Sequence, residues 1–252
     1  IYNSTPLCHH LHQITKVIKF KYVIGKSTNP YENLALESYL MEVVTEGSAI
    51  IYLWQNADTI VVGRNQNVYS ECLYEKFIKT GGRVARRKSG GGAVYHDLGN
   101  LNFSIISLKN DVQECKYQNI ITKALEHLGI NSEYNKRNDI LVNGKKFSGN
   151  AEYIRQNVIC QHGTLLIHTD IARMTSYLTP QKSKLERNHV KSVETRVINL
   201  EEVSPKLSID KMKNNILEVL NASPLKDYEN EEKILYYKKM YSRKEWIIGG
   251  NI

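Results

Sequence analysis

A run of three glycines, Gly90, Gly91 and Gly92, constrains this chain more than any other feature of its sequence. Three cations and a serine precede the run, and an apolar and aromatic segment of strand character follows it. Glycine allows positive φ angles and lets the backbone come close to a ligand. Successive N–H groups in such a loop form a concave site for an anion, and the preceding Arg86 and Arg87 supply the complementary charge. The run therefore predicts a loop that binds a carboxylate, a phosphate or a joined acyl-phosphate.

The composition is that of an ordinary globular protein. Its 252 residues, 41% of them hydrophobic, fit one large domain or two small ones. No apolar run approaches the ~20 residues that a membrane span requires, so no membrane partner is expected. The net charge of +8 favours an anionic partner. Nucleic acid is not predicted as that partner, because the cations are dispersed and no nucleic-acid-binding motif is present.

The four cysteines, Cys8, Cys72, Cys115 and Cys160, show neither a CxxC pair nor zinc-like spacing. We interpret them as reduced thiols of an intracellular protein. The absence of a recognisable targeting signal separately favours a bacterial cytoplasm over a mitochondrial matrix. Cys160 stands two residues before His162, so a nucleophilic cysteine is one interpretation. Its apolar neighbours favour the other, a buried cysteine that packs as a small hydrophobe.

Local patterns predict helices and strands in irregular alternation. Asn29 followed by Pro30 is typical of a helix start, with asparagine as the N-cap and proline in the first turn. Asn143-Gly144 between two strand-like runs predicts a hairpin. Hairpins between successive strands favour an α+β fold with a mixed or mostly antiparallel sheet over a doubly wound one. Strands are expected at 50–54, 59–62, 83–86, 93–95, 101–108 and 158–168, and helices from residue 30 and at 71–79, 117–128, 170–178 and 211–220.

Residues 86–102, RRKSGGGAVYHDLGNLN, resemble the signature of lipoate–protein ligase A and its relatives. Three further segments, 62–67, 138–151 and 161–166, resemble the same family in the same order. The resemblance implies a catalytic domain of the biotin and lipoate ligase type, similar to class II synthetases. It also implies a reaction in which lipoate and ATP, with Mg²⁺, form lipoyl-AMP, and the lipoyl group passes to a lysine of an acceptor. The acceptors in this family are apo-lipoyl domains of 2-oxoacid dehydrogenase complexes and the glycine cleavage H protein.

The resemblance assigns roles to residues of the glycine run and of the segment 138–151. Arg87 matches the arginine that contacts the nucleotide, and Lys146 matches the lysine that bridges the lipoyl carbonyl and the phosphate. A compact ammonium on a flexible stem suits this bridging role, whereas the adjacent Lys145 points to the opposite face of a strand. The backbone expected to line the adenylate is that of Gly92, Ala93, Val94 and Tyr95.

Four further residues are candidates with structural alternatives. Gly91, Arg64 and His162 are candidates to line the lipoate site, with Arg64 on a loop over the acyl pocket. His162 is equally compatible with a buried core histidine. Asp139 is a candidate to position Lys146 or to hold Mg²⁺, and a structural turn carboxylate is the alternative.

Two predictions concern the extent of the chain. Residues 1–17 differ from the rest and are expected to be a leader or a disordered segment, and residues 18–252 to be the catalytic domain. In ligases of this family a small accessory domain frequently follows the catalytic one. No such segment follows here, which makes a separate accessory protein a candidate partner.

Other functions compete with that of a complete ligase. One is a lipoyl or octanoyl transferase that depends on a partner for pre-made lipoyl-AMP, or that forms a thioester on Cys160. A biotin–protein ligase would carry a different arginine-glycine loop, and a non-enzymatic basic protein is compatible with the charge alone. His96 next to Asp97 resembles a catalytic dyad, but we interpret this pair as structural.

Overall fold

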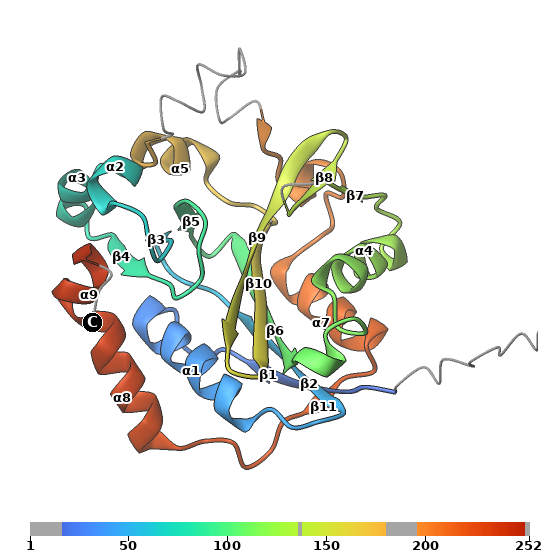
Figure 1. The fold of residues 1–252 in the computed structure, drawn as a ribbon. Helices are drawn as coiled ribbons and strands as arrows, with labels where there is room; N and C mark the ends of the chain where they lie inside the picture. Colours follow the sequence, from blue (N-terminus) through green and yellow to red (C-terminus); the bar gives the residue numbers. More distant parts are fainter. Residues whose placement is uncertain (1–16, 136–137, 180–195, 250–252) are drawn as a thin grey trace, which may run out of the picture.

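Two β-sheets with packed helices make up the part of the chain that the structure describes, residues 17–135, 138–179 and 196–249 of a computed structural model (Figure 1). The strands of the larger sheet are Lys19–Ile24 (β1), Ser48–Trp54 (β2), Asn100–Leu108 (β6), Glu133–Tyr134 (β7), Asp139–Val142 (β8), Lys145–Arg155 (β9), Val158–Leu166 (β10) and Ser223–Pro224 (β11). Their order is β11-β1-β2-β6-β10-β9-β8-β7. The parallel pairs are those that β1 forms with β2 and β11, and the other pairs are antiparallel. The sheet is therefore mixed and mostly antiparallel, which confirms the predicted α+β class.

Helices cover both faces of this sheet. α1 (Pro30–Val43) and α8 (Glu231–Ser242) pack on one face, and α4 (Tyr117–His127) and α7 (Ile209–Val219) pack on the other (Figure 1). Successive side chains of a strand point to opposite faces. Alternate residues of β2 accordingly belong to the core under α1 and to the core under α4, and all but the first residue of this strand are buried.

Two central strands carry polar side chains at buried positions. Ser104 on β6 pairs with His162 on β10, and Asn102 pairs with Thr164 in the same ladder. These four residues stand two apart along their strands and so share one face of the sheet. Because buried polar groups require partners, this face is where a binding site is expected.

The smaller sheet holds the glycine run. Its strands, in the order β4-β3-β5, are Thr59–Val62 (β3), Arg83–Arg86 (β4) and Val94–His96 (β5). The run joins β4 to β5. The short helices around this sheet are α2 (Val68–Glu71), α3 (Tyr74–Lys79), α5 (Ile171–Tyr177) and α9 (Lys244–Gly249), and 3-10 turns occur at Lys109–Asp111 and Leu200–Glu202.

Two local predictions are confirmed in detail. Asn29 caps α1, and its side chain accepts a hydrogen bond from the Tyr31 N–H. Asn143 and Gly144, with φ of 52° and 70°, form the turn between β8 and β9. Positive φ at both residues is the geometry that Asn-Gly hairpins adopt.

The helix predicted at 71–79 is confirmed only from Tyr74 to Lys79, and its predicted start at Glu71 is wrong. α2 ends before Cys72, which has an extended backbone and forms a β-bridge with Leu178. The Leu73 N–H donates to the carbonyl of Tyr177 at 2.9 Å. Pairing with the end of α5 therefore interrupts a segment whose local pattern favours a continuous helix.

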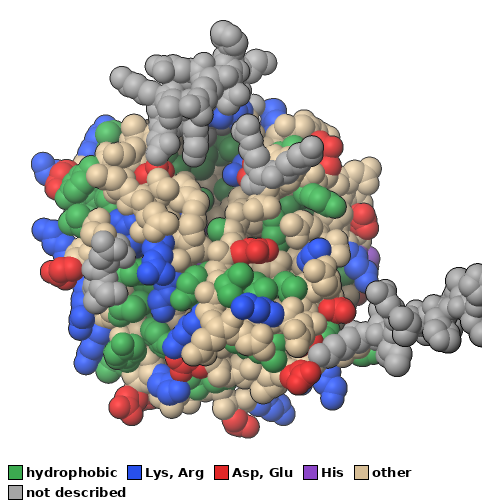
Figure 2. Space-filling model, viewed as in Figure 1, with side chains coloured by type: hydrophobic (Ala, Val, Ile, Leu, Met, Phe, Trp, Pro, Cys, Tyr) green, Lys and Arg blue, Asp and Glu red, His purple; other side chains and the backbone are tan. Residues whose placement is uncertain are grey.

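The molecular surface mixes charges of both signs. On the face shown in Figure 2, blue basic side chains lie among red acidic ones rather than in one stripe. In the described part of the chain, none of the helices is both long enough and apolar enough to cross a membrane. The predicted leader lies outside the described residues, apart from Val17.

Candidate active site

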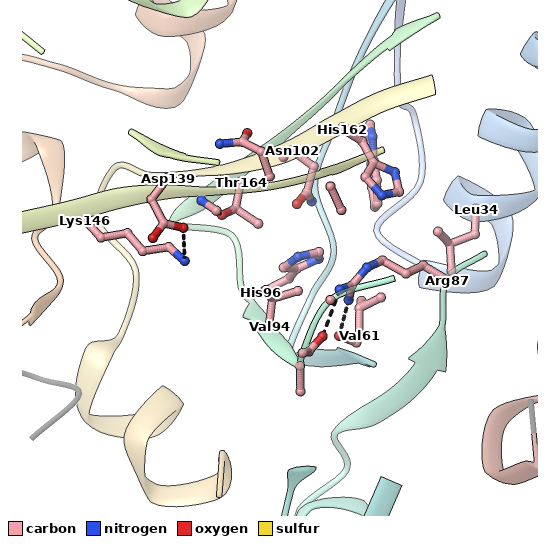
Figure 3. A pocket seen from close by; sticks show the side chains of 18 residues that line it. Leu34, Val61, Arg87, Val94, His96, Asn102, Asp139, Lys146, His162 and Thr164 are labelled. Carbon is pink, nitrogen blue, oxygen red and sulfur yellow. Dashed lines mark hydrogen bonds and ion pairs between the residues drawn. The ribbon is translucent and has the colours of Figure 1, made fainter. Parts of the chain in front are cut away.

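The glycine run borders a cavity of about 420 Å³ that opens between the two sheets (Figure 3). Strands β6, β9 and β10 contribute one wall, and the glycine run with β3 and β5 contributes the other. The lining residues are Leu34, Trp54, Val61, Arg87, Gly91, Gly92, Ala93, Val94, His96, Asn102, Asp139, Lys146, Gly149, Asn150, Ala151, His162, Gly163 and Thr164.

Arg87 holds the glycine run in shape. Its buried guanidinium donates to the Ser89 Oγ (3.0 Å), to the carbonyls of Gly90 (2.7 Å) and Gly92 (2.8 Å), and to the main chain of β3. Gly91 has a φ of +91°, and a Cβ there would stand 2.8 Å from Arg87 Nη2. Burial lowers the pKa of Arg87 to about 10, so the side chain keeps its charge at neutral pH. The loop is thus wrapped around a fixed cation at the edge of the cavity.

The neighbouring Arg86 has a structural role. It is fully buried, and it donates to the carbonyls of Trp246 (2.9 Å), Ile247 (3.0 Å) and Ile248 (3.0 Å) in the last turns of α9. The same guanidinium binds three carbonyls of the loop after β3. A cation at a helix C-terminus is stabilising, so Arg86 joins α9, this loop and β4.

Lys146 and Asp139 form an ion pair of 2.7 Å on the hairpin wall of the cavity (Figure 3). The β8–β9 ladder changes register near this pair, and such irregularities re-aim side chains. Phe147 is buried in the core, whereas Lys146 lines the cavity. The adjacent Lys145 is exposed and lines neither this cavity nor its neighbour.

His162 belongs to a buried chain of hydrogen bonds at the other side of the cavity. Its Nδ1 lies 2.8 Å from Glu37 Oε1, and its Nε2 lies 2.7 Å from Ser89 Oγ. Glu37 also accepts from Ser104 Oγ at 2.6 Å. An ionised carboxylate only accepts, so Nδ1 carries a proton and donates to Glu37. Because Ser89 also accepts a hydrogen bond from Arg87, this series of hydrogen bonds couples the position of His162 to that of the glycine run.

The partners of Glu37 keep it ionised. Burial alone would raise the pKa of Glu37, but the charge and hydrogen bond of His162, with hydrogen bonds from Ser104 and Cys160, lower it overall. Burial, and then the nearby Glu37, raise the pKa of the Cys160 thiol well above its ordinary value. Cys160 is 1% exposed and does not line the cavity. A nucleophile must be a thiolate with access to its substrate, so this geometry does not favour a thioester on Cys160.

One group of three possible metal ligands lies close together among the described residues: Glu37, Cys160 and His162. All three are buried, and Glu37 forms hydrogen bonds with both of the others. The protonated thiol is a poor metal ligand, because the thiolate is the ligating form. We interpret the group as a hydrogen-bonded cluster.

A second cavity of about 690 Å³ adjoins the first on the hairpin side. Both cavities are lined by Ala93, Val94, Asp139, Lys146, Gly149 and Thr164. The second continues along β5, β8 and the C-terminal half of α5. Two ligands can therefore lie end to end, with their junction beside the Lys146 ammonium.

The structure brings most of the predicted site residues together. The first cavity is lined by Arg87, Gly91, Gly92, Ala93, Val94, Asp139, Lys146 and His162. Tyr95 lines only the second cavity, and its hydroxyl donates to Asp58. The Ala93 N–H donates to Glu71 Oε2 at 3.0 Å. Arg64 lines neither cavity: its N–H pairs with the Ser89 carbonyl at 2.9 Å, and its side chain is exposed.

Sequence analysis did not identify Glu37, Trp54, Asn102 or Thr164 as site residues. A signal for two of them exists in retrospect. Glu37 follows Asn33 by one helical turn and is the one charged side chain among the buried residues of α1. On β6 the polar Asn100, Asn102 and Ser104 alternate with apolar residues, and every residue of the strand but the last is buried.

Comparison with known proteins now gives this geometry a family. A sequence profile described as the lipoyl protein ligase A/B catalytic domain matches residues 29–221. The chain belongs to this family. It is 40% identical to the lipoate-protein ligase A of Bdellovibrio bacteriovorus over 198 residues, 77% of this chain and 58% of that protein. It is 38% identical to the probable lipoate-protein ligase A of Mycoplasma pneumoniae over 238 residues, 89% of this chain and 70% of that protein. The chain therefore spans less than two thirds of the first of these relatives.

Solved structures of the family have the same fold. A bi-partite lipoate protein ligase from Thermoplasma acidophilum, studied with its E2 lipoyl domain, matches with a TM-score of 0.77 and 25% identity over 93% of this chain and 97% of that one. A lipoate-protein ligase A bound with ATP matches with a TM-score of 0.75 and 25% identity over 93% and 99%. LipL1 of P. falciparum in complex with lipoate matches with a TM-score of 0.75 and 28% identity over 92% and 75%. The predicted family and fold are both confirmed.

Proposed function

We propose that this member of the lipoyl ligase family is the catalytic domain of an ATP-dependent lipoate–protein ligase. It would join lipoate to AMP and transfer the lipoyl group to a lysine of a carrier domain. The observation that carries the proposal is the junction of two cavities beside the Lys146–Asp139 pair. The first cavity includes apolar side chains, among them Leu34, Trp54 and Val61, against which an acyl chain can pack, and the second cavity is larger, as a nucleotide requires. Relatives that bind lipoate and ATP support this assignment.

The first step joins two anions. A carboxylate oxygen of lipoate attacks the α-phosphorus of ATP, the bond from that phosphorus to the pyrophosphate oxygen breaks, and pyrophosphate leaves. Fixed positive charge where negative charge develops lowers such a barrier. We assign this role to Lys146, which lines both cavities, with the backbone of the glycine run on the facing wall. Arg87 would act mainly by holding that run, since its guanidinium already forms four hydrogen bonds to protein oxygens.

The second step forms an amide. The neutral Nζ of an acceptor lysine attacks the lipoyl carbonyl carbon, the bond to the phosphate oxygen breaks, AMP leaves, and the new amide nitrogen loses a proton. Negative charge grows on the carbonyl oxygen, where Lys146 can donate a hydrogen bond. Water must be kept from the mixed anhydride, and the buried His162 side of the cavity provides that exclusion for the acyl chain.

Mg²⁺ fits the donor set at Asp139. This ion is commonly held by one or two carboxylates together with substrate phosphates. Among the described residues, Asp139 is the one carboxylate that lines both cavities. A bound Mg²⁺ would neutralise phosphate charge there, while Asp139 also orients Lys146.

We further propose lipoyl domains of 2-oxoacid dehydrogenases and the glycine cleavage H protein as acceptors. The E2 lipoyl domain of the bi-partite archaeal system supports the first of these. A separate accessory protein is a candidate partner, because the system in which that relative was studied is bi-partite. A cytoplasmic location and the domain limits 18–252 stay predictions.

A transferase that takes pre-made lipoyl-AMP is the second candidate. The chain spans 58% of the Bdellovibrio relative, so a part of the reaction can reside in the remainder of such proteins. The test is the mass of an apo-lipoyl domain after incubation with the protein, lipoate and Mg²⁺, with ATP in one tube and pre-made lipoyl-AMP in another. A lipoyl mass gain with ATP supports the ligase, and a gain only with lipoyl-AMP supports the transferase. No gain in either tube contradicts both.

A further inference from the structure

Two buried polar atoms lie at the first cavity without a protein partner. His96 Nε2 and Asn102 Nδ2 have no hydrogen-bond partner among the described residues. Their side chains are 3% and 1% exposed, and both line the cavity. Figure 3 shows them between Lys146 on one side and His162 on the other. Buried polar groups in proteins are nearly always paired, so these two point to a ligand.

A relay of hydrogen bonds from Tyr52 on β2 through Asn33 on α1 fixes His96 as a donor. The Tyr52 hydroxyl donates to Asn33 Oδ1 (2.8 Å), and Asn33 Nδ2 donates to Asn56 Oδ1 (2.9 Å). Asn56 therefore presents its Nδ2 to His96 Nδ1, at 3.1 Å. Since Nδ1 accepts, the proton of the neutral imidazole is on Nε2. Burial lowers the pKa of His96 to about 3, which keeps the ring neutral and Nε2 a donor.

Asn102 offers a second donor beside it. Its Oδ1 accepts from Asn100 Nδ2 at 2.9 Å, which leaves Nδ2 as the unpaired group of a side chain that lines the cavity. The surrounding wall includes the apolar side chains of Trp54, Val61 and Val94. The cavity thus holds two N–H donors next to apolar side chains, at a distance from Lys146 in the direction of His162 (Figure 3).

We propose that His96 and Asn102 select an acyl chain that carries hydrogen-bond acceptors beyond its carboxylate, namely the dithiolane sulfurs of lipoate, over a plain alkyl chain such as octanoate. This inference rests on the proposed function and adds its substrate preference. Sulfur is a weak acceptor, whereas methylene groups would enclose both donors unpaired. A site that forms hydrogen bonds with its ligand discriminates strongly against an analogue that lacks the hydrogen-bonding groups. This discrimination is larger than that of an apolar pocket against a ligand of slightly different size.

The decisive probe is an isostere of lipoate. In cyclopentyl-pentanoate the ring size and chain length are kept, and two methylene groups replace the two sulfurs. We expect kcat/KM for ligation to an apo-lipoyl domain to be at least about tenfold higher with lipoate. In the variant Asn102→Leu, the kcat/KM values for lipoate and for the isostere should differ by less than about threefold, chiefly because kcat/KM for the isostere rises. The matched control is Ser107→Ala, also buried on β6 but outside the cavity, which should keep the wild-type ratio.

Equal use of the two acids by the wild-type protein would overturn the inference while leaving the ligase intact. Ligation of neither acid would contradict the proposed function instead. In that case the dissociation constants of the two acids, measured calorimetrically without ATP, still decide the selection. A tenfold preference for lipoate supports it, and equal binding, or binding of neither, overturns it. The wild-type comparison does not depend on whether Asn102→Leu folds.

Discussion

The two sides of the first cavity are built in different ways. On one side Lys146 stands on a hairpin strand with 39% of its side chain exposed, paired with a single carboxylate. On the other side His162 is 10% exposed and belongs to a chain of hydrogen bonds through Glu37, Ser104 and Ser89. The first side is a partly exposed point charge, and the second is a buried polar network.

This difference predicts that the Lys146 side acts on the reacting atoms and that the His162 side positions other groups. A lysine with a flexible stem can follow an oxygen from substrate to intermediate, so its removal should affect rate far more than stability. A buried network in which every member has a partner raises rigidity, and the loss of one member leaves others unsatisfied. Changes on the His162 side should therefore appear in stability as well as in rate.

The largest effect is expected at Lys146. Lys146→Ala should lower the rate of lipoyl transfer by about 100- to 1000-fold, the loss typical of one donor to a developing oxyanion. The midpoint of thermal unfolding should change little, because the side chain is partly exposed. The measurement is single-turnover transfer from pre-made lipoyl-AMP to an apo-lipoyl domain. Lys145→Ala, the adjacent exposed lysine, is the matched control; equal losses in both variants would show that general hairpin charge, not the Lys146 position, matters.

The glycine run lies between the Lys146 side and the His162 side of the cavity, and its glycines should differ in how well they tolerate substitution by alanine. Gly91→Ala places a Cβ at φ +91° and 2.8 Å from Arg87 Nη2. Left-handed backbone costs a non-glycine residue about 1–2 kcal/mol, and displacement of Arg87 should lower ligation by about 10- to 100-fold. A Cβ on Gly90 would meet no heavy atom within 4 Å, and the φ of Gly90 is not positive. Gly90→Ala should therefore stay within about threefold of wild type in the same assay, and equal sensitivity at both positions would argue against the Arg87 contact.

A third test concerns the fixed network. Glu37→Gln keeps the size of the side chain but removes the charge that accepts from His162, Ser104 and Cys160. Hydrogen bonds to a buried charge contribute about 1.5–3 kcal/mol, so the free energy of unfolding in urea at pH 7 should fall by that amount. Transfer should slow by less than in Lys146→Ala, because Glu37 does not line the cavity.

The stability difference between wild type and Glu37→Gln should also depend on pH in a definite direction. The pKa of Glu37 is lowered in the folded protein, so its contribution is complete above the unfolded value of about 4.3 and is lost as pH falls through the lower folded value. The stability difference between wild type and Glu37→Gln should thus be constant above about pH 5 and shrink in more acidic solution. Glu126→Gln, an exposed glutamate of α4, should show no comparable difference. A difference that grows on acidification would contradict the ionised state of Glu37.

The parts of the fold that were predicted depend on local signals. The cap at Asn29, the Asn143-Gly144 turn and strand β3 are set by residues close in sequence. α8 was not predicted, because only Tyr237 and Tyr241 among its residues are buried and the rest of its pattern is polar. Strand β1 was also missed, since its place in the sheet depends on parallel pairing with β2 and β11.

The site residues, like the fold, include some that local sequence patterns predict and others that only the structure reveals. Gly91, Lys146 and His162 stand in recognisable segments, so the sequence was enough to propose them. The partner of His162 could not be found in this way, because Glu37 lies 125 positions away on α1. The orphaned Nε2 of His96 is likewise visible only in three dimensions, because its tautomer follows from Asn33 and Asn56. Hydrogen bonds between segments distant in sequence cannot be predicted from local sequence patterns. Those bonds decide whether a polar side chain offers a donor or an acceptor to the cavity.

The smallest effect is expected at Cys160, and it separates a positioning network from a nucleophile. The thiol is buried, protonated and hydrogen-bonded to Glu37. Cys160→Ser keeps a donor to Glu37, and Cys160→Ala removes it, so transfer should stay within about threefold of wild type in the first and decline modestly in the second. If Cys160 formed a thioester, both variants would lose transfer together, and an acyl adduct on Cys160 would be found by peptide mass after a denaturing quench. Retained activity in Cys160→Ser places the acyl group on the adenylate alone, and the network around Glu37 then acts by holding His162 and the glycine run in place.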